Sequence, residues 1–392
     1  MARLGLFFVL AAVVASVGAT AASSSRSAKP PIKITIIGGF TSSTPAELSP
    51  ETAAAARARV AAINAAGGIR GRKVQLTVCD DHVDVNAAGD CARQAVADGS
   101  LALVGTIGFE NTQIYPTIEA AGMVSLGAFP IGPVAGNSPN AICLTGGGTA
   151  EMSALPVLLA RHGVTKVSAL VPGGLGPATT GLESTFQNGV KEAKIDIGAI
   201  AEFPLTAAQF DAPVAKALAG GVNGVVAFAP GAAQGPLALA VLNGNSSVKL
   251  GVPAAALSPS VISFLGSRGD GIYVAGAGAP ATSKKPGIKL FNHDIDKYAK
   301  GTAKDDLSID AWASVYLFEQ LTKRVRVLSR ASILRAAKSL TNYNLGGIYG
   351  PLTTTTPFDK FPGMKCLANN TVVTEQLKNG KFVALGRLPA FP

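Results

Sequence analysis

The stretch from Pro50 to Asp81 constrains the fold more than any other part of the sequence, because a helix signal, a double-glycine stop and a strand follow one another there. Ser49 suits the N-cap position, and proline at the next position suits the first turn of a helix. An alanine-rich run leads to Gly67-Gly68, where glycine adopts the left-handed conformation in which helices end. The strand Val74–Cys79 then runs into two aspartates, which are poor strand formers. This order predicts one passage of an open parallel sheet, with a crevice-lining loop at the carboxyl end of the strand.

Strand and helix patterns alternate along the rest of the chain. The run Ile32–Ile37 is continuously apolar, as expected for a strand covered by helices on both faces. The alternation is interrupted at Gly146-Gly147-Gly148 and then resumes as a second set up to Ala275. Further on, Asn379-Gly380 between two β-type runs predicts a hairpin. A chain of 392 residues exceeds the single-core limit of roughly 250–300 residues, so we predict two α/β domains.

The first 21 residues have the pattern of a secretory signal peptide. Arg3 precedes the apolar run Leu4–Val17, and Ala19-Thr20-Ala21 has the small-x-small form of a cleavage site. No cysteine follows this run, which argues against a lipid anchor, and no later apolar stretch reaches the about 20 residues of a membrane span. We expect a signal peptide over residues 1–21, a disordered leader over residues 22–31, and a mature protein in the periplasm or outside the cell.

The charge balance is basic without the pattern of a nucleic-acid-binding protein. The sequence has 34 Lys and Arg against 24 Asp and Glu, a formal net charge of +10. The basic residues are scattered, with loose clusters such as Lys323–Arg326, rather than interleaved with aromatic residues. We interpret them as a solvated surface that helps to attract anionic ligands, and we expect no nucleic-acid partner.

Four cysteines in an exported chain favour disulfide bonds, and three pairings are open to them. Cys79 closes a strand and Cys91 lies on the helix expected beside it, so we predict a local bridge between these two. Cys143 and Cys366 then remain. Their bridge would join a strand near the first crossing between the domains to the C-terminal segment.

Motifs for enzyme chemistry are weak or absent in the sequence. The first strand is followed by GGFTSST, which lacks the G-x-G-x-x-G spacing of dinucleotide-binding folds, and no phosphate-binding P-loop motif occurs. No G-x-S-x-G elbow accompanies the three histidines. His82 stands near Cys79 and Asp80, but oxidation of the thiol on export would remove a metal ligand. We therefore expect no catalytic residue, no cofactor and no metal site.

The order of signals at the start of the mature chain carries a family resemblance. A strand at Ile32–Ile37, a Thr/Ser-rich loop, a helix ending in INAAGGIRGRKV and a strand ending in CDD resemble the start of type I periplasmic solute-binding proteins. That family includes the branched-chain amino-acid- and leucine-binding proteins of ABC importers. The resemblance implies two doubly wound parallel-sheet α/β lobes joined by a three-strand hinge. It places residues 32–146 and 276–347 in lobe I and residues 147–275 and 348–392 in lobe II, and it implies an ABC permease and an ATPase as partners.

The ligand site is expected at the loops that follow the carboxyl ends of the parallel strands. In the family's amino-acid binders, two such loops hold the ligand carboxylate, and they align with Gly108–Thr112 and Gly127–Phe129. Phenylalanine and glutamate stand at 109 and 110 where small hydroxyl residues are usual, and the loop PGAAQG lacks the acidic residue expected to meet a ligand amine. The predicted ligand-binding residues, from both lobes, are Thr41, Phe109, Glu110, Asn111, Thr112, Ala128, Phe129, Gly174, Leu175, Gln234 and Ser258.

This eroded amino-acid signature changes the expected ligand. Burying a ligand ring of about 150–200 Å² against Phe109 and Phe129 would contribute roughly 4–5 kcal/mol, and backbone N–H groups with Asn111, Thr112 and Gln234 would hold a carboxylate or amide. The alternative is that both phenylalanines belong to the core of their lobe. The predicted function is a receptor that captures a small amino-acid-like, aromatic or apolar carboxylate or amide for an ABC importer.

Two other functions remain open at this point. A ligand-sensing module of a signalling system would share the fold and would be encoded beside a kinase or regulator rather than a permease. An exported hydrolase would need a nucleophile–base pair, which the sequence motifs do not supply.

Overall fold

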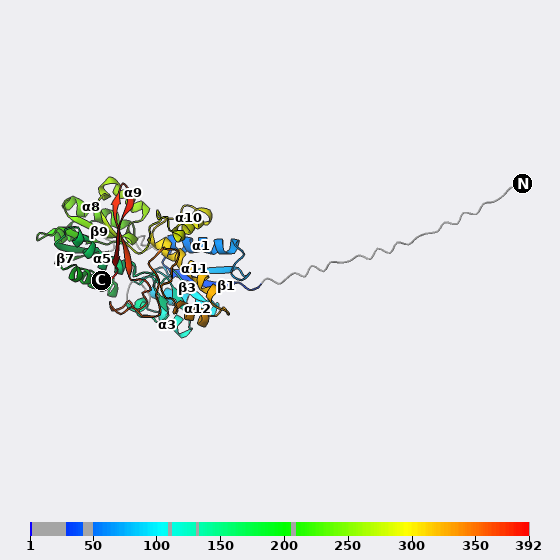
Figure 1. The fold of residues 1–392 in the computed structure, drawn as a ribbon. Helices are drawn as coiled ribbons and strands as arrows, with labels where there is room; N and C mark the ends of the chain where they lie inside the picture. The colour runs from blue at the N-terminus through cyan, green and yellow to red at the C-terminus, as the bar shows by residue number, and fades with distance from the viewer. Residues whose placement is uncertain (2–28, 42–49, 109–111, 131–132, 205–208, 392) are drawn as a thin grey trace.

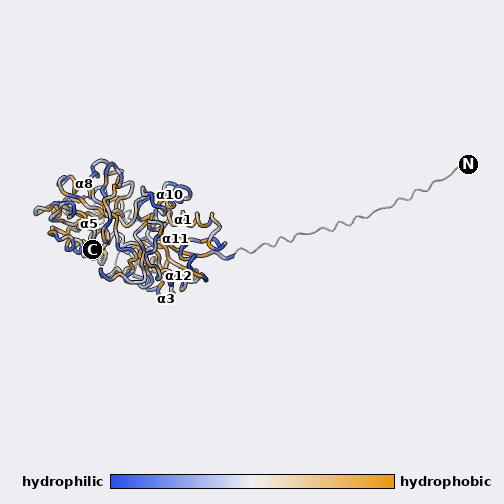
Figure 2. Tube along the Cα trace, viewed as in Figure 1, coloured by the Kyte–Doolittle hydropathy of each residue, from blue (hydrophilic) through white to orange (hydrophobic). Residues whose placement is uncertain are grey.

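The computed structural model describes the chain except for residues 2–28, 42–49, 109–111, 131–132, 205–208 and 392. The expected signal peptide, apart from its first residue, and most of the expected leader lie outside the described residues. The described chain forms two lobes, each built around one sheet with helices on its faces (Figure 1). Apolar segments run through the interior of both lobes (Figure 2).

All described strand pairs of the first sheet are parallel. Its strands are β1 (Ile32–Gly38), β2 (Val74–Asp80), β3 (Ala102–Val104), β4 (Val124–Leu126) and β5 (Ala141–Ile142), in the order β2-β1-β3-β4-β5. Ile36 and Ile37 of β1 point to opposite faces of the sheet and are both fully buried, because helices cover both faces. The continuous apolar run in the sequence therefore predicted this strand correctly.

The second sheet is mixed rather than wholly parallel. Its strands are β6 (Lys166–Gly173), β7 (Asp196–Pro204), β8 (Gly224–Ala227), β9 (Lys249–Pro253), β10 (Tyr273–Gly276), β11 (Thr371–Lys378) and β12 (Lys381–Pro389), in the order β12-β11-β10-β9-β8-β6-β7. β11 and β12 form the antiparallel hairpin predicted at Asn379-Gly380, and β11 pairs antiparallel with β10. The rest of the sheet is parallel.

Helices connect the strands and cover the sheets. In the first lobe they are α1 (Pro50–Ala65), α2 (Val85–Ala97), α3 (Ile114–Ala120), α4 (Pro133–Asn137), α10 (Pro286–Tyr298), α11 (Asp306–Arg324) and α12 (Arg330–Ala337). In the second lobe they are α5 (Gly147–Arg161), α6 (Pro177–Ala193), α7 (Asp211–Leu218), α8 (Gln234–Gly244) and α9 (Pro259–Leu265), with the short 3-10 helices η2 (Gly231–Ala233), η3 (Ala254–Ala256) and η4 (Gly266–Gly269). The chain crosses between the lobes after β5, after β10 and before β11.

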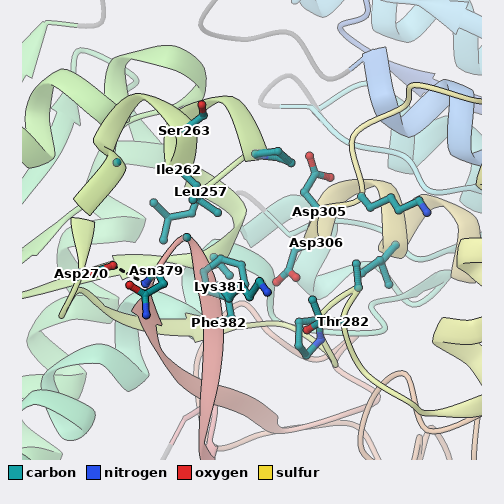
Figure 3. A pocket seen from close by; sticks show the side chains of 18 of the residues that line it. Leu257, Ile262, Ser263, Asp270, Thr282, Asp305, Asp306, Asn379, Lys381 and Phe382 are labelled. Atoms are coloured by element: carbon teal, nitrogen blue, oxygen red, sulfur yellow. Dashed lines mark hydrogen bonds between the residues drawn. The ribbon is translucent and has the colours of Figure 1, made fainter. Parts of the chain in front are cut away.

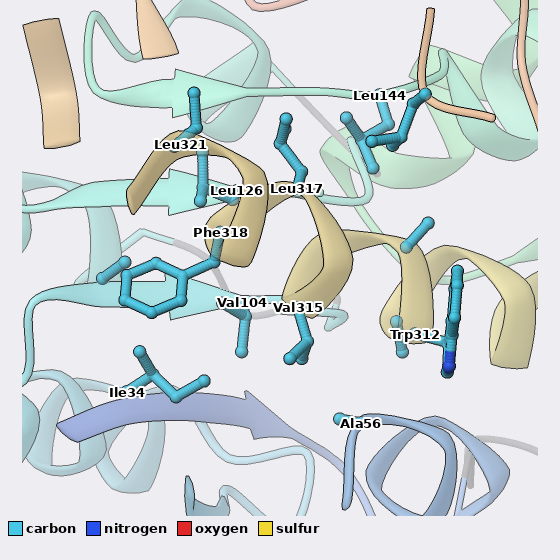
Figure 4. Close-up of a cluster of buried hydrophobic side chains, with 14 of the residues drawn as sticks. Ile34, Ala56, Val104, Leu126, Leu144, Trp312, Val315, Leu317, Phe318 and Leu321 are labelled. Carbon is cyan, nitrogen blue, oxygen red and sulfur yellow. The ribbon is translucent and has the colours of Figure 1, made fainter. Parts of the chain in front are cut away.

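Helix α11 forms the centre of the first lobe's core. Phe318 and Leu321 of this helix are fully buried and lie toward the side chains of β1, β3 and β4 (Figure 4). Trp312 is also fully buried and packs on Phe291 of α10 and Arg59 of α1. Asp305 caps the helix in a reciprocal capping box with Ser308, which fixes the point where the helix begins. Each fully buried side chain of this size stabilises the fold by about 1.5–3 kcal/mol, so α11 holds α1 and the sheet together.

A buried ion-pair network joins three helices of the first lobe. Arg59 of α1 donates to Asp294 Oδ2 of α10 at 2.9 Å and to Glu319 Oε2 of α11 at 2.5 Å. Trp312 Nε1 donates to the same Asp294 oxygen at 3.0 Å. Only 2% of the Asp294 side chain is exposed, so this carboxylate depends on its partners to offset the loss of water.

The triple glycine spans the start of a helix, with Gly146 as its N-cap. Gly147, with a positive φ of 52°, is the first residue of α5, and the helix continues through Pro156 to Arg161. Glycine is needed at 147 because Phe129 packs where a side chain would lie: an added Cβ would come within 2.8 Å of its ring.

Both predicted disulfides are present in the structure. Cys79 at the end of β2 is bonded to Cys91 of α2, and Cys143 just after β5 is bonded to Cys366. The backbone pairs beside the second bridge, because Cys143 N–H donates to Cys366 O and Ala368 N–H donates to Cys143 O, each at 2.9 Å. The C-terminal segment is thereby fixed to the first crossing between the lobes.

The segment between residues 348 and 368 packs against both lobes. Ile348, Tyr349 and Leu352 belong to the apolar core of the first lobe. Met364 and Leu367 belong to a core cluster of the second lobe. The division of the lobes at residue 348 remains a prediction, and we propose that the third crossing extends over this segment.

Candidate functional site

The carboxyl ends of the parallel strands in both sheets face the boundary between the lobes. β5 leaves the first sheet at its carboxyl end toward α5 of the second lobe, and β1, β3 and β4 run parallel to it. β10 leaves the second sheet at its carboxyl end toward α10 of the first lobe, and β6, β8 and β9 run parallel to it. Because parallel strands end at the same edge of a sheet, loops from both lobes meet at this boundary.

Both parallel arrays reverse their strand order at an equivalent point. In the first sheet the reversal lies between β1 and β3, and in the second it lies between β6 and β8. Ligands of open α/β sheets bind at such switch points. Of the predicted ligand-binding residues, Thr41 and Thr112 follow the switch-point strands of the first sheet, and Gly174, Leu175 and Gln234 follow those of the second.

Thr41 lies in a hydrogen-bonded cluster at the ends of β1 and β2. Its hydroxyl donates to Asp80 Oδ2 and lies 3.1 Å from His82 Nδ1. The backbone N–H groups of Phe40 and His82 donate to Asp80 Oδ1, each at 3.0 Å. Burial by itself would raise the pKa of Asp80, but the hydrogen bonds from Thr41 and these N–H groups outweigh it, so the pKa of this carboxyl is lowered. The ionised carboxylate holds the loop that presents Thr41.

The other predicted residues of the first lobe lie at the ends of β3 and β4. Thr112 is exposed, and Ala128 is buried in the core under α2 and α3. Phe129 is half-buried, its N–H donates to Thr106 O at 3.1 Å, and its ring packs on Gly147 at the first crossing. Phe109, Glu110 and Asn111 lie outside the described residues.

The predicted residues of the second lobe have distinct local roles. Gly174 is exposed with a φ of 80°, a conformation that favours glycine, and Leu175 N–H donates to Thr179 Oγ1 at 3.2 Å. Ser258 is half-buried and caps α9, accepting from Val261 N–H at 3.4 Å. These contacts fix the loops after β6 and β9.

Two buried polar atoms at the switch points have no hydrogen-bond partner in the part of the chain that the structure describes. One is Thr106 Oγ1, two residues after β3, and the other is Gln234 Nε2 at the start of α8. Gln234 Oε1 accepts from Ala229 N–H at 2.6 Å, so its amide plane is fixed while its donor remains unused. Buried polar groups are nearly always paired in proteins, so an unpaired one in each lobe marks a place where a ligand or water can bind.

A pocket of about 630 Å³ lies between the lobes on the side of the C-terminal hairpin (Figure 3). Thr282, Asp305 and Asp306 from the first lobe face Leu257, Ile262 and Phe382 from the second. None of the predicted ligand-binding residues that the structure describes is among those that line it, although Ser258 stands between two lining residues. The pocket is also lined by Ser263, Asp270, Lys304, Ile309 and Lys381.

Carboxyl groups from both lobes gather at the boundary behind this pocket. Asp306 Oδ2 accepts from Ala277 N–H at 2.9 Å, Asp310 Oδ1 accepts from Tyr349 Oη at 2.8 Å, and Glu151 Oε2 accepts from Ala255 N–H at 3.4 Å. Burial is the largest cause of a raised pKa for each: to about 6 for Asp306, to about 7 for Asp310, and well above its usual range for Glu151.

The sequence offered a signal for the start of α11 but none for the pocket. Two adjacent aspartates before an apolar-periodic run are typical of a helix N-terminus. The hairpin tip comes more than 70 residues later in the sequence. It lies opposite these two aspartates only because the chain crosses back to the second lobe. Among the described residues, no group of His, Cys, Asp and Glu has the geometry to hold a metal ion.

The fold and the boundary loops together define a two-lobed α/β binding protein, and sequence comparison assigns its family. The family model described as "Periplasmic binding protein" matches residues 31–368. The chain belongs to this family, whose type I members include the proteins that the sequence resembles. No curated protein matches the sequence in a direct comparison.

Solved structures with the same fold are solute-binding proteins. An extracellular ligand-binding receptor from Verminephrobacter eiseniae has a TM-score of 0.78 at 18% identity, over 90% of this chain and 99% of its own. A solute-binding protein from R. palustris in complex with 4-hydroxybenzoate has a TM-score of 0.75 at 16% identity, over 93% of this chain and 98% of its own. The branched-chain amino-acid transporter substrate-binding protein LivJ from Streptococcus pneumoniae in complex with isoleucine has a TM-score of 0.72 at 17% identity, over 92% of this chain and 99% of its own.

None of the described helices combines the length and the apolar character that crossing a bilayer requires.

Proposed function

We propose that this protein is an extracytoplasmic receptor that captures a small carboxylate or amide with an aromatic or apolar body and delivers it to an ABC importer. The observation that carries the proposal is the meeting of two switch points across one boundary, with an unpaired buried polar atom in each lobe. Membership of the periplasmic binding protein family agrees with this role.

The proposed mechanism is closure of the lobes on the ligand. A ligand that accepts a hydrogen bond from Gln234 Nε2 and contacts Thr106 Oγ1 touches both lobes at once. Such a ligand binds the closed arrangement better than an open one, and only this difference in affinity can shift the balance between them. The ligand leaves unchanged, because no step of the mechanism makes or breaks a bond in it.

The chemistry of the loops supports the ligand class. Gln234 offers an amide donor at the start of α8, where amino-acid binders are expected to place an acid for the ligand amine. Phe129 presents a half-buried ring at the end of β4. The neutral amide donor of Gln234 suits a carboxylate or amide group of a ligand, and the aromatic ring of Phe129 suits an apolar body. A solved structure with this fold is in complex with 4-hydroxybenzoate, which carries a carboxylate on an aromatic body.

A thermal-shift screen tests the proposed ligand class. We expect 4-hydroxybenzoate or benzoate to stabilise the protein more than leucine or isoleucine does, with about 2.7 kcal/mol of stabilisation at a hundredfold excess over Kd. Stabilisation by leucine or isoleucine alone would contradict the assignment of the ligand class.

A matched pair of variants tests the site. Thr106→Val removes a hydroxyl that has no partner among the described residues, so it should leave the unliganded protein nearly as stable while weakening the ligand about 5- to 20-fold. Thr356→Val makes the same change on an exposed loop and should alter neither. Equal affinities of both variants and the wild type would remove the switch-point loop of the first lobe from the site.

A further inference from the structure

The pocket between the lobes carries more negative charge than positive charge. Asp270, Asp305 and Asp306 line it together with Lys304 and Lys381. Lys304 is already paired with Asp296 at 2.7 Å. Among the described residues, no Lys, Arg or His forms an ion pair with Asp305 or Asp306. This local excess stands out in a chain with a net charge of +10.

Further carboxyl groups lie behind the pocket, and burial raises the pKa of each of them. They are Glu51 of α1, Glu151 of α5, Asp310 of α11 and Glu375 of β11, and Tyr349 donates to Asp310. The side chains of Glu151 and Glu375 are 0% and 2% exposed, and Oε1 of each has no partner in the described part of the chain. A buried carboxyl without a counter-charge must take up a proton or find a cation.

The rest of the pocket wall is apolar. Leu257 and Ile262 from the second lobe and Ile309 from the first line it, and Phe382 of the hairpin closes one side (Figure 3). A volume of about 630 Å³ is in the range of pockets that bind small organic molecules. The pocket thus offers an apolar wall and an acidic end.

We propose that this pocket is a second binding site, which takes a small organic cation: an ammonium or guanidinium group on an apolar body. The charged group lies at Asp305 and Asp306, and the apolar body lies against α9 and the hairpin. Because its walls come from both lobes, an occupant contacts both lobes and favours the arrangement in which they are close. Among the described residues, the site shares no lining residue with the predicted switch-point site, and it does not depend on the ligand proposed for that site.

A set of probes of equal length tests the charge requirement. The full mature chain is titrated with hexylamine, hexanol and hexanoate by calorimetry and thermal shift at pH 7. Hexylamine should bind at least tenfold more tightly than either of the others. Equal affinities for the three, tighter binding of hexanoate, or no binding of hexylamine would overturn the proposal.

Variants test the location of the site. Asp306→Asn keeps the shape and removes a charge, and it should weaken hexylamine at least tenfold, whereas Asp196→Asn on an exposed strand end should not. Because Asn at 306 also changes the contact with Ala277, Ser263→Trp provides a second test: it fills the pocket from an exposed position of α9. Ser260→Trp, on the same helix but outside the lining, is its control. Hexylamine binding that survives Ser263→Trp would place the site elsewhere.

The pH dependence gives an independent readout. Asp306 has a pKa of about 6, raised mainly by burial, so its ionised fraction rises about tenfold between pH 5 and pH 7. Hexylamine affinity should rise by about the same factor over this range. A flat profile would show that the carboxyl groups do not hold the cation. Thr106→Val should leave hexylamine binding unchanged, which separates this site from the one at the switch points.

Discussion

The two lobes share a strand order but differ in what lies at one edge of the sheet. In the first lobe, the parallel array ends at β5, which leads directly into the crossing. In the second lobe, the equivalent strand β10 is followed in the sheet by the antiparallel hairpin of β11 and β12. The hairpin tip contributes Asn379 to Phe382 to the interlobe pocket, and the described part of the first lobe has no counterpart.

This difference separates what the lobes have in common from what makes the molecule asymmetric. The common array places the switch-point loops, because strand order alone decides where loops diverge. The hairpin adds a wall beside that boundary. The first lobe instead places a buried ion-pair network between its helices, and the boundary collects carboxyl groups without counter-charges. The interior of the first lobe and the boundary between the lobes should therefore differ in how pH and mutation affect them.

The largest loss of stability is expected from removing a disulfide bond. One bridge lies within the first lobe, and the other fixes the C-terminal segment at the crossing between the lobes. Replacing both Cys143 and Cys366 by serine opens a loop of 223 residues and should cost about 5 kcal/mol of unfolding free energy in the chain-entropy model. The same change at Cys79 and Cys91 opens a loop of 12 residues and should cost about 3 kcal/mol. Denaturant titration measures both, and a reversed order would mean that the crossing is held by contacts other than the bridge.

The second prediction concerns the ion-pair network of the first lobe. Arg59→Met leaves Asp294 buried without its cationic partner and should cost about 3–5 kcal/mol. Arg93→Met breaks an exposed pair with Asp90 and should cost under about 1 kcal/mol. Urea midpoints of the two variants test the contrast. If both changes cost the same small amount, the network does not organise the helices of this lobe.

The third and smallest expected effect is at the boundary. Burial first, and then the charge of Asp306, raises the pKa of Asp310 to about 7, so the folded protein holds a proton that the unfolded chain has already lost. Stability should therefore be highest below about pH 4 for this group and should fall as the pH rises toward 8. Asp310→Asn cannot ionise and should flatten that fall, whereas Asp359→Asn on the surface should not. Thermal midpoints between pH 5 and pH 8 measure the difference.

Much of the fold could be predicted from local patterns. The apolar run Ile32–Ile37, the stop at Gly67-Gly68 and the turn at Asn379-Gly380 each determine their structure through neighbouring residues, and all three are found as expected. The bridge between Cys79 and Cys91 followed from the strand and helix on which they stand, whereas the distant pair Cys143 and Cys366 was predicted only because it remained. The local features depend on short-range chemistry, which a single sequence contains.

Features that depend on contacts between distant segments could not be predicted. The start of α5 at Gly147 depends on the ring of Phe129, and the pocket depends on the hairpin lying across from Asp305. The unpaired amide of Gln234 is equally invisible in the sequence, because its burial is set by the packing of α8. The ligand-binding residues at the switch points remain predictions. The strand order supports their position, and the ligand screen tests their role.

The most direct test of the central claim is a distance measurement between the lobes. Spin labels at Lys191→Cys on α6 and Lys300→Cys after α10 report their separation by pulsed electron paramagnetic resonance. With saturating 4-hydroxybenzoate, we expect the distance distribution to become narrower and to shift to a closed arrangement, and Thr106→Val should require more ligand for the same shift. An unchanged distribution while calorimetry shows the ligand bound would contradict capture by closure of the two lobes.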